Sequence, residues 1–132
     1  MEGTTAGNKM SIAPRISEVN GAQHIGASVI PVWLEDAAVD YFKRAIGEAV
    51  PSPMLSPSMR KSEIDFLREV FYPDIADITT TLEHVGTSSI VLQQQIVQRA
   101  AVVCTARSVW VNTAAGGATP IPANVAALLS NL

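Results

Sequence analysis

The fold of this chain is decided by residues 18–49, which are EVNGAQHIGASVIPVWLEDAAVDYFKRAIGEA. From Val29 onward, apolar residues recur at every third or fourth position, and most charged residues fall on the other side of the same helical projection. That period is typical of an amphipathic helix with a broad apolar face. Proline is tolerated in the first turn of a helix, so Pro31 places the N-cap near Ser28, and we expect the helix to end near Ala49.

The segments on either side of this helix alternate like strands. An edge strand is expected at residues 9–18, where Pro14 removes one donor from the ladder. After a proline-rich loop, four strands and a short helix are expected at residues 62–72, 75–85, 88–97, 100–111 and 125–129, with Asn124 as the cap of the last. The central helix and the strands each span roughly 30 Å, so one sheet can curve around the whole helix. The sequence therefore predicts an α+β domain with a curved antiparallel sheet wrapped around one long central helix.

The composition is that of one globular domain. The chain has 132 residues, of which 48% are hydrophobic, and we expect a disordered tail at residues 1–9 and a single domain at residues 10–132. The net charge of −3 disfavours a nucleic-acid partner, which needs clustered Lys and Arg. No apolar run approaches the ~20 residues of a membrane helix, and no secretory signal is evident. The single Cys104 excludes an internal disulfide and favours a cytoplasmic protein without a membrane partner.

Five short motifs, in order along the chain, resemble those of a known enzyme family. They are EVNGAQHIGA at residues 18–27, WLEDA and YF at 33–37 and 41–42, IDFLR with Val70 at 64–70, HVGTSSI at 84–90, and ARSV with PIP at 106–109 and 120–122. The first motif matches the family pattern Asp-x-Asp-x-x-Gly-His-Val-Asn-Asn. The third motif matches hydrophobic-x-Tyr/Phe-x-Arg-Pro-Val, and the fourth motif matches hydrophobic-Gly-Arg/Thr-Ser-Ser-hydrophobic. Over about residues 14–130, the chain is similar to the hot-dog-fold acyl thioesterases of the 4-hydroxybenzoyl-CoA thioesterase type.

The resemblance implies a hot-dog fold and hydrolysis of an acyl-CoA or acyl-carrier-protein thioester. It also implies a homodimer or homotetramer with its sites at the subunit interface, which the apolar surplus of the chain favours as well. In much of the family the second Asp of the first motif is the nucleophile or general base, and Asn20 stands at the matching position. An amide has no basic lone pair near neutral pH. Asn20 can therefore hold the thioester or a water by hydrogen bonds, but it cannot take a proton.

Two other groups of thioesterases are similar at this motif. Enediyne polyketide thioesterases resemble the chain in having Asn in place of that Asp. Plant acyl-carrier-protein thioesterases have Asn-Gln-His, which Gln23 and His24 echo although Ala22 replaces the Asn. The Asn-Asn pair that ends the family motif is Gly26-Ala27 here, which removes two polar anchors.

Candidate site residues around the first motif follow from this match. The resemblance implies that backbone N–H groups at Ala27 and Ser28 form an oxyanion hole, which suits the unpaired amides and the dipole of a helix N-terminus. An ordinary capped helix is the alternative. His24 is either a general base for water or a residue that fixes the turn. Glu18 lies two residues before Asn20 and either supplies a carboxylate on the same face of an extended segment or is a solvated or ion-paired residue.

Further candidates lie elsewhere in the chain. Glu35, in the second turn of the helix, more often orients a loop than reacts. The resemblance implies that a carboxylate or hydroxyl from the partner subunit completes the site. Thr87 and Ser88 match the family turn best, and Glu69 is an additional candidate.

The remaining polar residues carry no chemistry in this interpretation. Glu63 and Asp65 fit the outward face of a strand better than a site. His84 and Cys104 are too isolated to bind a metal, because zinc needs three or four ligands. Neither a metal nor a cofactor is therefore expected.

The leading hypothesis is a cytoplasmic thioesterase-like protein with an atypical or weakened active site. Without a carboxylate at Asn20, the oxyanion hole and binding alone can leave ~10³–10⁴-fold catalysis, so a slow or specialised enzyme is expected. The alternatives are a non-catalytic acyl-binding or assembly module of the same fold, and a polyketide-releasing thioesterase. The acyl pocket and its cover are expected at Trp33, Met54, Leu55, Met59 and the loop at residues 49–60.

Overall fold

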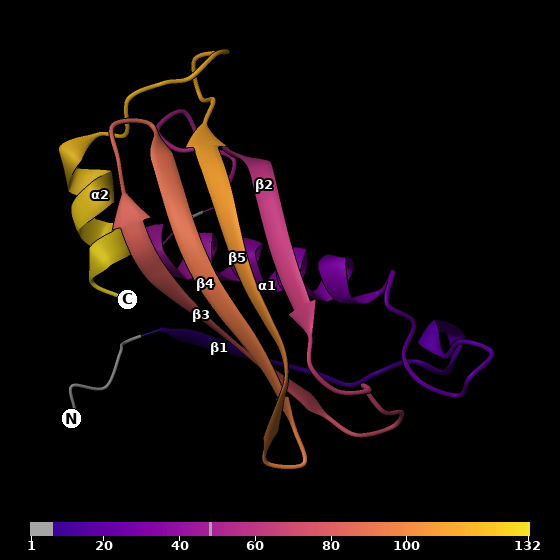
Figure 1. Ribbon diagram of the computed structural model, residues 1–132. Helices are drawn as coiled ribbons and strands as arrows, with labels where there is room; N and C mark the ends of the chain where they lie inside the picture. The colour runs from indigo at the N-terminus through magenta and orange to yellow at the C-terminus, as the bar shows by residue number, and fades with distance from the viewer. Residues whose placement is uncertain (1–6, 48) are drawn as a thin grey trace.

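A computed structural model describes residues 7–47 and 49–132. Its elements are, in chain order, β1 (Asn8–Ile12), the 3-10 helix η1 (Ile16–Glu18), α1 (Ile30–Ile46), β2 (Pro57–Phe66), β3 (Ala76–Val85), β4 (Ser89–Gln98), β5 (Ala101–Asn112) and α2 (Ala123–Ser130). The strands form one antiparallel sheet in the order β1-β3-β4-β5-β2, and α1 runs across one face of it (Figure 1). α2 contacts α1 and β3. The expected architecture, a curved antiparallel sheet around one long helix, is confirmed.

The long helix begins close to the expected position, but its cap differs. Pro31 lies in the first turn, as its missing N–H requires. Val29 occupies the N-cap without a side-chain hydrogen bond, so the prediction that Ser28 caps the helix is wrong. The apolar period is confirmed by the buried face, which consists of Ile30, Trp33, Leu34, Ala37, Ala38, Tyr41, Phe42 and Ala45.

The same helix ends at Ile46, earlier than the expected Ala49. Gly47 adopts the left-handed conformation with φ 71° and donates its N–H to Lys43 O at 2.9 Å. Glycine takes this conformation without a steric penalty and commonly ends helices in this way. Lys43 and Arg44 lie in the last turn, where positive charge is favourable to the helix dipole.

β2 is displaced from the expected strand at residues 62–72. It forms an edge of the sheet, and among residues 7–47 and 49–132 it pairs only with β5, so the proline at its first position is tolerated. The strand ends at Phe66, because the N–H groups of Leu67 and Arg68 both donate to Val103 O, at 2.9 and 3.1 Å, and the regular ladder stops there. The residues after Phe66 therefore form a loop instead of continuing the strand.

The ends of the domain also differ from expectation, whereas β3, β4 and β5 lie within one residue of the predicted strands. β1 stops at Ile12, before Pro14, instead of continuing to residue 18. β1 begins inside the tail expected at residues 1–9, and residues 1–6 of that tail lie outside the described residues. α2 starts before Asn124, so this residue is not its cap. No helix among residues 7–47 and 49–132 is long and apolar enough to cross a membrane.

The hydrophobic core lies between α1 and the sheet, in two clusters along the helix. The N-terminal cluster contains Ile25, Ile30, Trp33, Leu34, Ala37, Val70, Ala76, Ile78, Ile96, Val103, Cys104 and Ala106. The C-terminal cluster contains Ala38, Tyr41, Phe42, Ala45, Leu55, Ile90, Leu92, Trp110, Val125 and Leu129. The buried Gln94 donates from Nε2 to Leu34 O at 2.9 Å and to Thr80 Oγ1 at 3.0 Å, which fixes the middle of the helix on the sheet.

Candidate active site

The segment between η1 and α1 turns back on itself around Asn20. The Asn20 N–H donates to His24 O at 2.8 Å, and Asn20 O accepts from Gln23 N at 3.0 Å. The side-chain Oδ1 of Asn20 accepts from Ala22 N at 3.0 Å and from His24 N at 3.2 Å, a common way for Asn to stabilise a turn. The amide oxygen of Asn20 is therefore occupied. Among the described residues its Nδ2 meets no acceptor, so this nitrogen is the group left for a ligand.

A second turn leads from there into α1. The Gly26 N–H donates to Glu18 O at 3.0 Å, and the Val29 N–H donates to Gly26 O at 2.9 Å, so Ala27 and Ser28 occupy the two central positions of a turn. Within residues 7–47 and 49–132, the N–H groups of Ala27 and Ser28 have no hydrogen-bond acceptor. Two free backbone donors thus lie at the positive end of the α1 dipole, where developing negative charge is stabilised.

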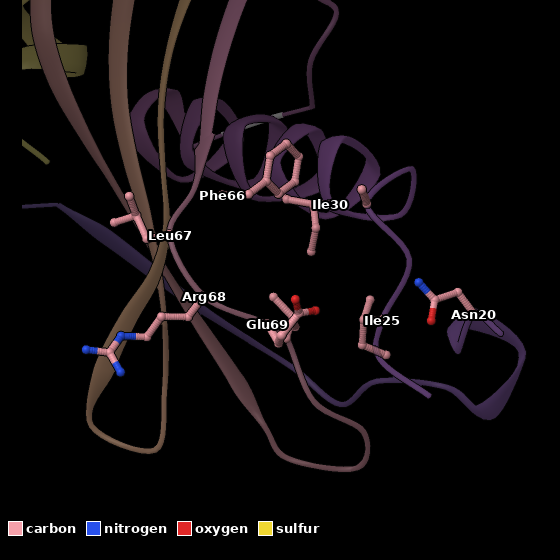
Figure 2. A pocket seen from close by; sticks show the side chains of 9 residues that line it. Asn20, Ile25, Ile30, Phe66, Leu67, Arg68 and Glu69 are labelled. Atoms are coloured by element: carbon pink, nitrogen blue, oxygen red, sulfur yellow. The ribbon is translucent and has the colours of Figure 1, made fainter. Parts of the chain in front are cut away.

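A cavity of about 270 Å³ lies between this segment and the loop that follows β2 (Figure 2). Its lining residues are Asn20, Ile25, Ala27, Ile30, Phe66, Leu67, Arg68, Glu69 and Val70. Figure 2 shows Asn20 on one side and Glu69 on the other, with Ile25 between them. The hydrogen bond from Ile25 N to Val70 O, at 2.8 Å, joins the two walls. The fold therefore brings Asn20, Ala27 and Glu69, three of the residues predicted from the sequence, to one cavity.

His24 lies beside this cavity and is not one of its lining residues. Its Nδ1 is 3.0 Å from Glu69 Oε2, and its ring makes an edge contact with Phe71 at a centroid distance of 5.2 Å. The side chain of His24 is 30% exposed and that of Glu69 is 64% exposed. A contact of this length between an imidazole nitrogen and a carboxylate oxygen restricts the positions that the two side chains adopt. The carboxylate that reaches the cavity thus belongs to Glu69, and His24 holds it in place.

Glu18 and Glu35 do not line the cavity. Glu18 Oε2 accepts from Trp33 Nε1 at 3.0 Å, and its Oε1 accepts from Arg15 N at 2.8 Å. Oε2 therefore ties η1 to α1, and Oε1 caps η1 itself. Glu35 lies on the exposed side of α1 and lines a different, shallow cavity together with Met10.

Thr87 and Ser88 lie far from this cavity within one chain. They form the turn between β3 and β4, where Ser88 O accepts from Asn112 N at 2.8 Å. Asn112 pairs with the first residue of β2, whereas the cavity begins at Phe66, the last residue of β2. The turn is therefore at the opposite end of the sheet. Glu63 pairs with Arg107 in the β2–β5 register, and both line a shallow polar cavity separate from the candidate site.

The residues expected to form an acyl pocket do not line this cavity. Trp33 and Leu55 are buried in the two core clusters, and Met54 and Met59 are exposed. One wall consists instead of residues 66–70, all of which lie within the strand expected at residues 62–72. In the sequence, only the match of this segment to the third family motif indicated that it belongs to the site.

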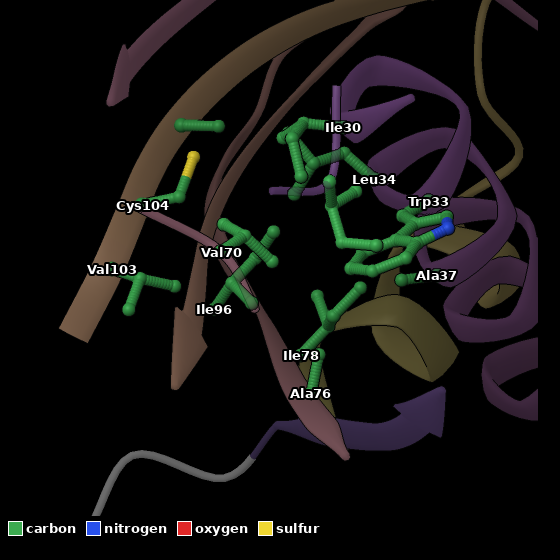
Figure 3. Close-up of a cluster of buried hydrophobic side chains, with 12 residues drawn as sticks. Ile30, Trp33, Leu34, Ala37, Val70, Ala76, Ile78, Ile96, Val103 and Cys104 are labelled. Atoms are coloured by element: carbon green, nitrogen blue, oxygen red, sulfur yellow. The ribbon is translucent and has the colours of Figure 1, made fainter. Parts of the chain in front are cut away.

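Cys104 is not a candidate nucleophile. It lies in the N-terminal cluster with Ile30 and Val70, which also line the cavity (Figure 3). Burial, with a smaller contribution from the charge of Asp65, raises the pKa of the Cys104 thiol from 9.0 to about 11, so the thiol stays protonated. In the described part of the chain, no group of three or more His, Cys, Asp or Glu side chains is placed to hold a metal ion.

The fold is found in several solved thioesterase structures. A predicted thioesterase from Bacillus stearothermophilus is 28% identical, with a TM-score of 0.83 over 96% of each chain. A thioesterase from Thermus thermophilus in complex with coenzyme A and Zn is 17% identical, with a TM-score of 0.82 over 96% of this chain and 98% of that one. A mutant 4-hydroxybenzoyl-CoA thioesterase in complex with 4-hydroxybenzoyl-CoA is 18% identical, with a TM-score of 0.83 over 94% and 99%. These likenesses confirm the hot-dog fold.

The comparison with curated proteins found no match. The family model of the thioesterase-like superfamily matches residues 14–129, which include the whole candidate cavity and both core clusters. The match thus spans nearly all of the described fold, in agreement with the order of the motifs along the sequence. The chain belongs to the thioesterase-like superfamily.

Proposed function

We propose that this protein hydrolyses the thioester bond of an acyl group carried on coenzyme A or on an acyl carrier protein. The observation that carries the proposal is the cavity at the start of α1, which Ala27 lines together with the polar residues Asn20 and Glu69. Among the described residues the N–H groups of Ala27 and of the adjacent Ser28 have no acceptor. In the reaction, the oxygen of a water attacks the thioester carbonyl carbon and the C–S bond breaks. The products are a carboxylic acid and a thiol.

The backbone donors at Ala27 and Ser28 suit the negative charge that develops on the carbonyl oxygen. One such donor contributes a factor of about 10²–10³ to kcat in hydrolases where it has been removed. Asn20 Nδ2, which faces the same cavity, can donate to the carbonyl oxygen or hold the attacking water. Because the Oδ1 of Asn20 is occupied by its own turn, Asn20 acts as a donor and not as a base.

The choice of substrate class rests on relatives and on charge. The Thermus thermophilus neighbour binds coenzyme A, and the 4-hydroxybenzoyl-CoA thioesterase mutant binds 4-hydroxybenzoyl-CoA. Arg68 is exposed at the rim of the cavity and points away from Asn20, as Figure 2 shows. A cation in that position is suited to a phosphate of coenzyme A or of a carrier-bound phosphopantetheine.

The proposed active form is a homodimer joined along β2. Within the described chain only β5 pairs with β2, so the other edge of β2 has backbone groups available for a second strand. Exposed apolar side chains lie along and just beyond it, with Phe66 at 52% and Leu67 at 56%. Antiparallel pairing of two β2 strands sets the end of one against the start of the other. This arrangement would bring the partner's Thr87 and Ser88 to the cavity, as the family resemblance implies.

Thiol release from a panel of thioesters tests the function. The purified protein is incubated with short, long and aromatic acyl-CoAs and with an acyl carrier protein loaded with the same acyl groups, and free thiol and acid are quantified. We expect both products in equal amounts from at least one substrate, and a dimer by light scattering. The absence of turnover on every thioester would contradict the proposal. Acyl-CoA binding without turnover would indicate the non-catalytic module, and turnover confined to carrier-bound polyketides would indicate the polyketide-releasing enzyme. The cytoplasmic location stays a prediction.

A further inference from the structure

Glu69 occupies a position where the family motif has proline. In hydrophobic-x-Tyr/Phe-x-Arg-Pro-Val, Arg68 and Val70 match their positions, and Glu69 stands between them. The same chain has Asn20 where much of the family has a carboxylate. Asn20 and Glu69 line the same cavity from opposite walls. Asn20 thus replaces the usual carboxylate on one wall of the cavity, and Glu69 supplies a carboxylate on the facing wall.

The backbone on both sides of Glu69 is anchored. Before it, the Arg68 N–H donates to Val103 O at 3.1 Å. After it, Val70 is 4% exposed, belongs to the N-terminal cluster, and accepts from Ile25 N at 2.8 Å. The anchored backbone sets where the Glu69 side chain begins and therefore which part of the cavity it can reach.

The Glu69 side chain is exposed and has one contact that restrains it. His24 Nδ1 lies 3.0 Å from Glu69 Oε2, while among the described residues Oε1 has no hydrogen-bond partner. His24 is itself held by its backbone bonds to Asn20 and by the edge of Phe71 at 5.2 Å. Gln98 in turn holds Phe71, accepting from Phe71 N at 2.8 Å and donating to Phe71 O at 2.9 Å. One oxygen of the carboxylate is therefore oriented and the other is free to accept a proton.

We propose that Glu69 is the general base of this site and that His24 is its positioning residue. This assignment rests on the proposed thioester hydrolysis. It differs from the sequence analysis, where His24 was either a general base or a residue that fixes the turn and Glu69 was an additional candidate. Glu69 takes a proton from water as the water oxygen bonds to the carbonyl carbon, and the amides of Ala27 and Ser28 hold the oxyanion. The C–S bond then breaks, and the proton on Glu69 passes to the leaving sulfur. Acid and thiol are formed, and the carboxylate is regenerated.

The first test replaces Glu69 by its neutral isostere. We expect Glu69→Gln to lower kcat by about 10²–10³-fold, the usual contribution of a general base, with KM changed by less than about threefold. Glu35→Gln is the matched control, because Glu35 lies on the exposed side of α1, outside both the cavity and β2. This control keeps the wild-type kcat. Circular dichroism and thermal unfolding of both variants confirm that they fold.

The second test restores a carboxylate on the other wall. In the Glu69→Gln background, Asn20→Asp raises kcat by at least about tenfold, because a base is again present at the cavity. His24→Ala lowers kcat by about tenfold in the wild-type background, since a displaced reacting group loses rate. It has no further effect when Glu69 is already Gln, because His24 acts only through that carboxylate. A merely structural role for His24 would lower stability and activity in both backgrounds.

Each outcome has one meaning. An active wild-type protein whose Glu69→Gln variant keeps its kcat, or loses only substrate affinity, overturns the assignment while leaving thioester hydrolysis intact. The assignment is also overturned if Asn20→Asp fails to restore activity, or if His24→Ala acts equally in both backgrounds. A wild-type protein that is inactive on every thioester overturns the hydrolysis itself. The failure of the proposed function is therefore distinct from the failure of this assignment.

Discussion

The two ends of α1 are built for different purposes. At its C-terminal end, Tyr41 donates its hydroxyl to Leu129 O at 2.8 Å, and the rings of Phe42 and Trp110 make an edge contact at 5.3 Å. α2 packs against α1 at this end. At the N-terminal end, two loops surround a cavity with Asn20, Glu69 and unpaired backbone amides. Both ends of α1 pack on a hydrophobic cluster, but only the N-terminal end also presents Asn20 and Glu69 at a cavity.

The loops at both ends of α1 are held in place, because a buried amide side chain bonds to the backbone of a loop at each end. At the C-terminal end of α1, the closed end, Asn112 accepts from Ser56 N and donates to Met54 O. At the N-terminal end of α1, the open end, Gln98 Nε2 donates to the carbonyl oxygens of Phe71 and Asp74, both at 2.9 Å. The difference lies in what lines the space between the loops. At the C-terminal end a cavity of about 140 Å³ is lined mainly by apolar side chains, including Phe42 and Trp110, and at the N-terminal end the cavity of about 270 Å³ is lined by Asn20 and Glu69 as well.

The largest expected effect is on stability at the closed end. Phe42 is fully buried between Tyr41 and Trp110, so Phe42→Ala should lower the free energy of unfolding by about 3–5 kcal/mol in urea titrations. Ile16→Ala, at the open end, removes a side chain that is 69% exposed and should cost less than about 1 kcal/mol. Equal losses for the two variants would contradict the division of the molecule into a stabilising and a reactive end.

The next effect is on catalysis at the open end. Ala27 lies at the second position of a turn, where proline is favoured, so Ala27→Pro removes one free N–H with little change in the fold. We expect kcat for thioester hydrolysis to fall by about 10²–10³-fold, or about 3 kcal/mol. The matched control is Ala123→Pro, at the first position of α2, which also follows an extended residue, Pro122. An equal kcat in the two proline variants would rule out an oxyanion hole at the start of α1.

Much of the fold could be predicted because its signals are local. The apolar period of α1 depends only on neighbouring turns, and β3, β4 and β5 follow from alternation within each strand. β2 was misplaced because the alternation of Ile64 and Phe66 gives no sign in the sequence of where it stops. The strand ends where Leu67 and Arg68 donate to Val103, which is distant in sequence. Edge strands have one neighbour, so such contacts set their ends.

The candidate site could be predicted only in part, for the same reason. The resemblance to a family located Asn20 and the amides of Ala27 and Ser28, because they belong to one continuous motif. The contact between His24 and Glu69 joins two distant segments, and no periodicity reports it. Glu18 was a candidate because an extended segment would place it beside Asn20. The segment forms η1 instead, and Glu18 bonds to Trp33.

A smaller effect compares the two buried amides. Replacing Gln98 or Asn112 by Ala leaves backbone groups of a loop without partners, so each variant should lose about 1–3 kcal/mol of stability in urea. Only Gln98→Ala should also lower kcat, by about tenfold, since the loop that it holds carries Phe71 and Glu69. Asn112→Ala serves as the control for stability, with kcat per folded molecule unchanged. A loss of kcat in Asn112→Ala, with none in Gln98→Ala, would contradict the assignment of the reactive end.

The smallest effect is on stability at alkaline pH, and it separates the two core clusters. Burial raises the pKa of Cys104, in the N-terminal cluster, from 9.0 to about 11, and that of Tyr41, in the C-terminal cluster, from 10.0 to about 12. The unfolded chain therefore loses each proton at a lower pH than the folded chain, and deprotonation favours unfolding. The free energy of unfolding should be constant below about pH 9. It should decrease above that pH as Cys104 deprotonates in the unfolded chain, and more steeply above about pH 10, where Tyr41 deprotonates there as well. Urea titrations from pH 7 to pH 11 test this. In Cys104→Ala the free energy of unfolding should begin to decrease only at about pH 10. In Tyr41→Phe the decrease should begin at the same pH as in the wild type and be less steep above about pH 10. A wild-type profile that is flat up to pH 11 would mean that neither group is desolvated at its end of the helix.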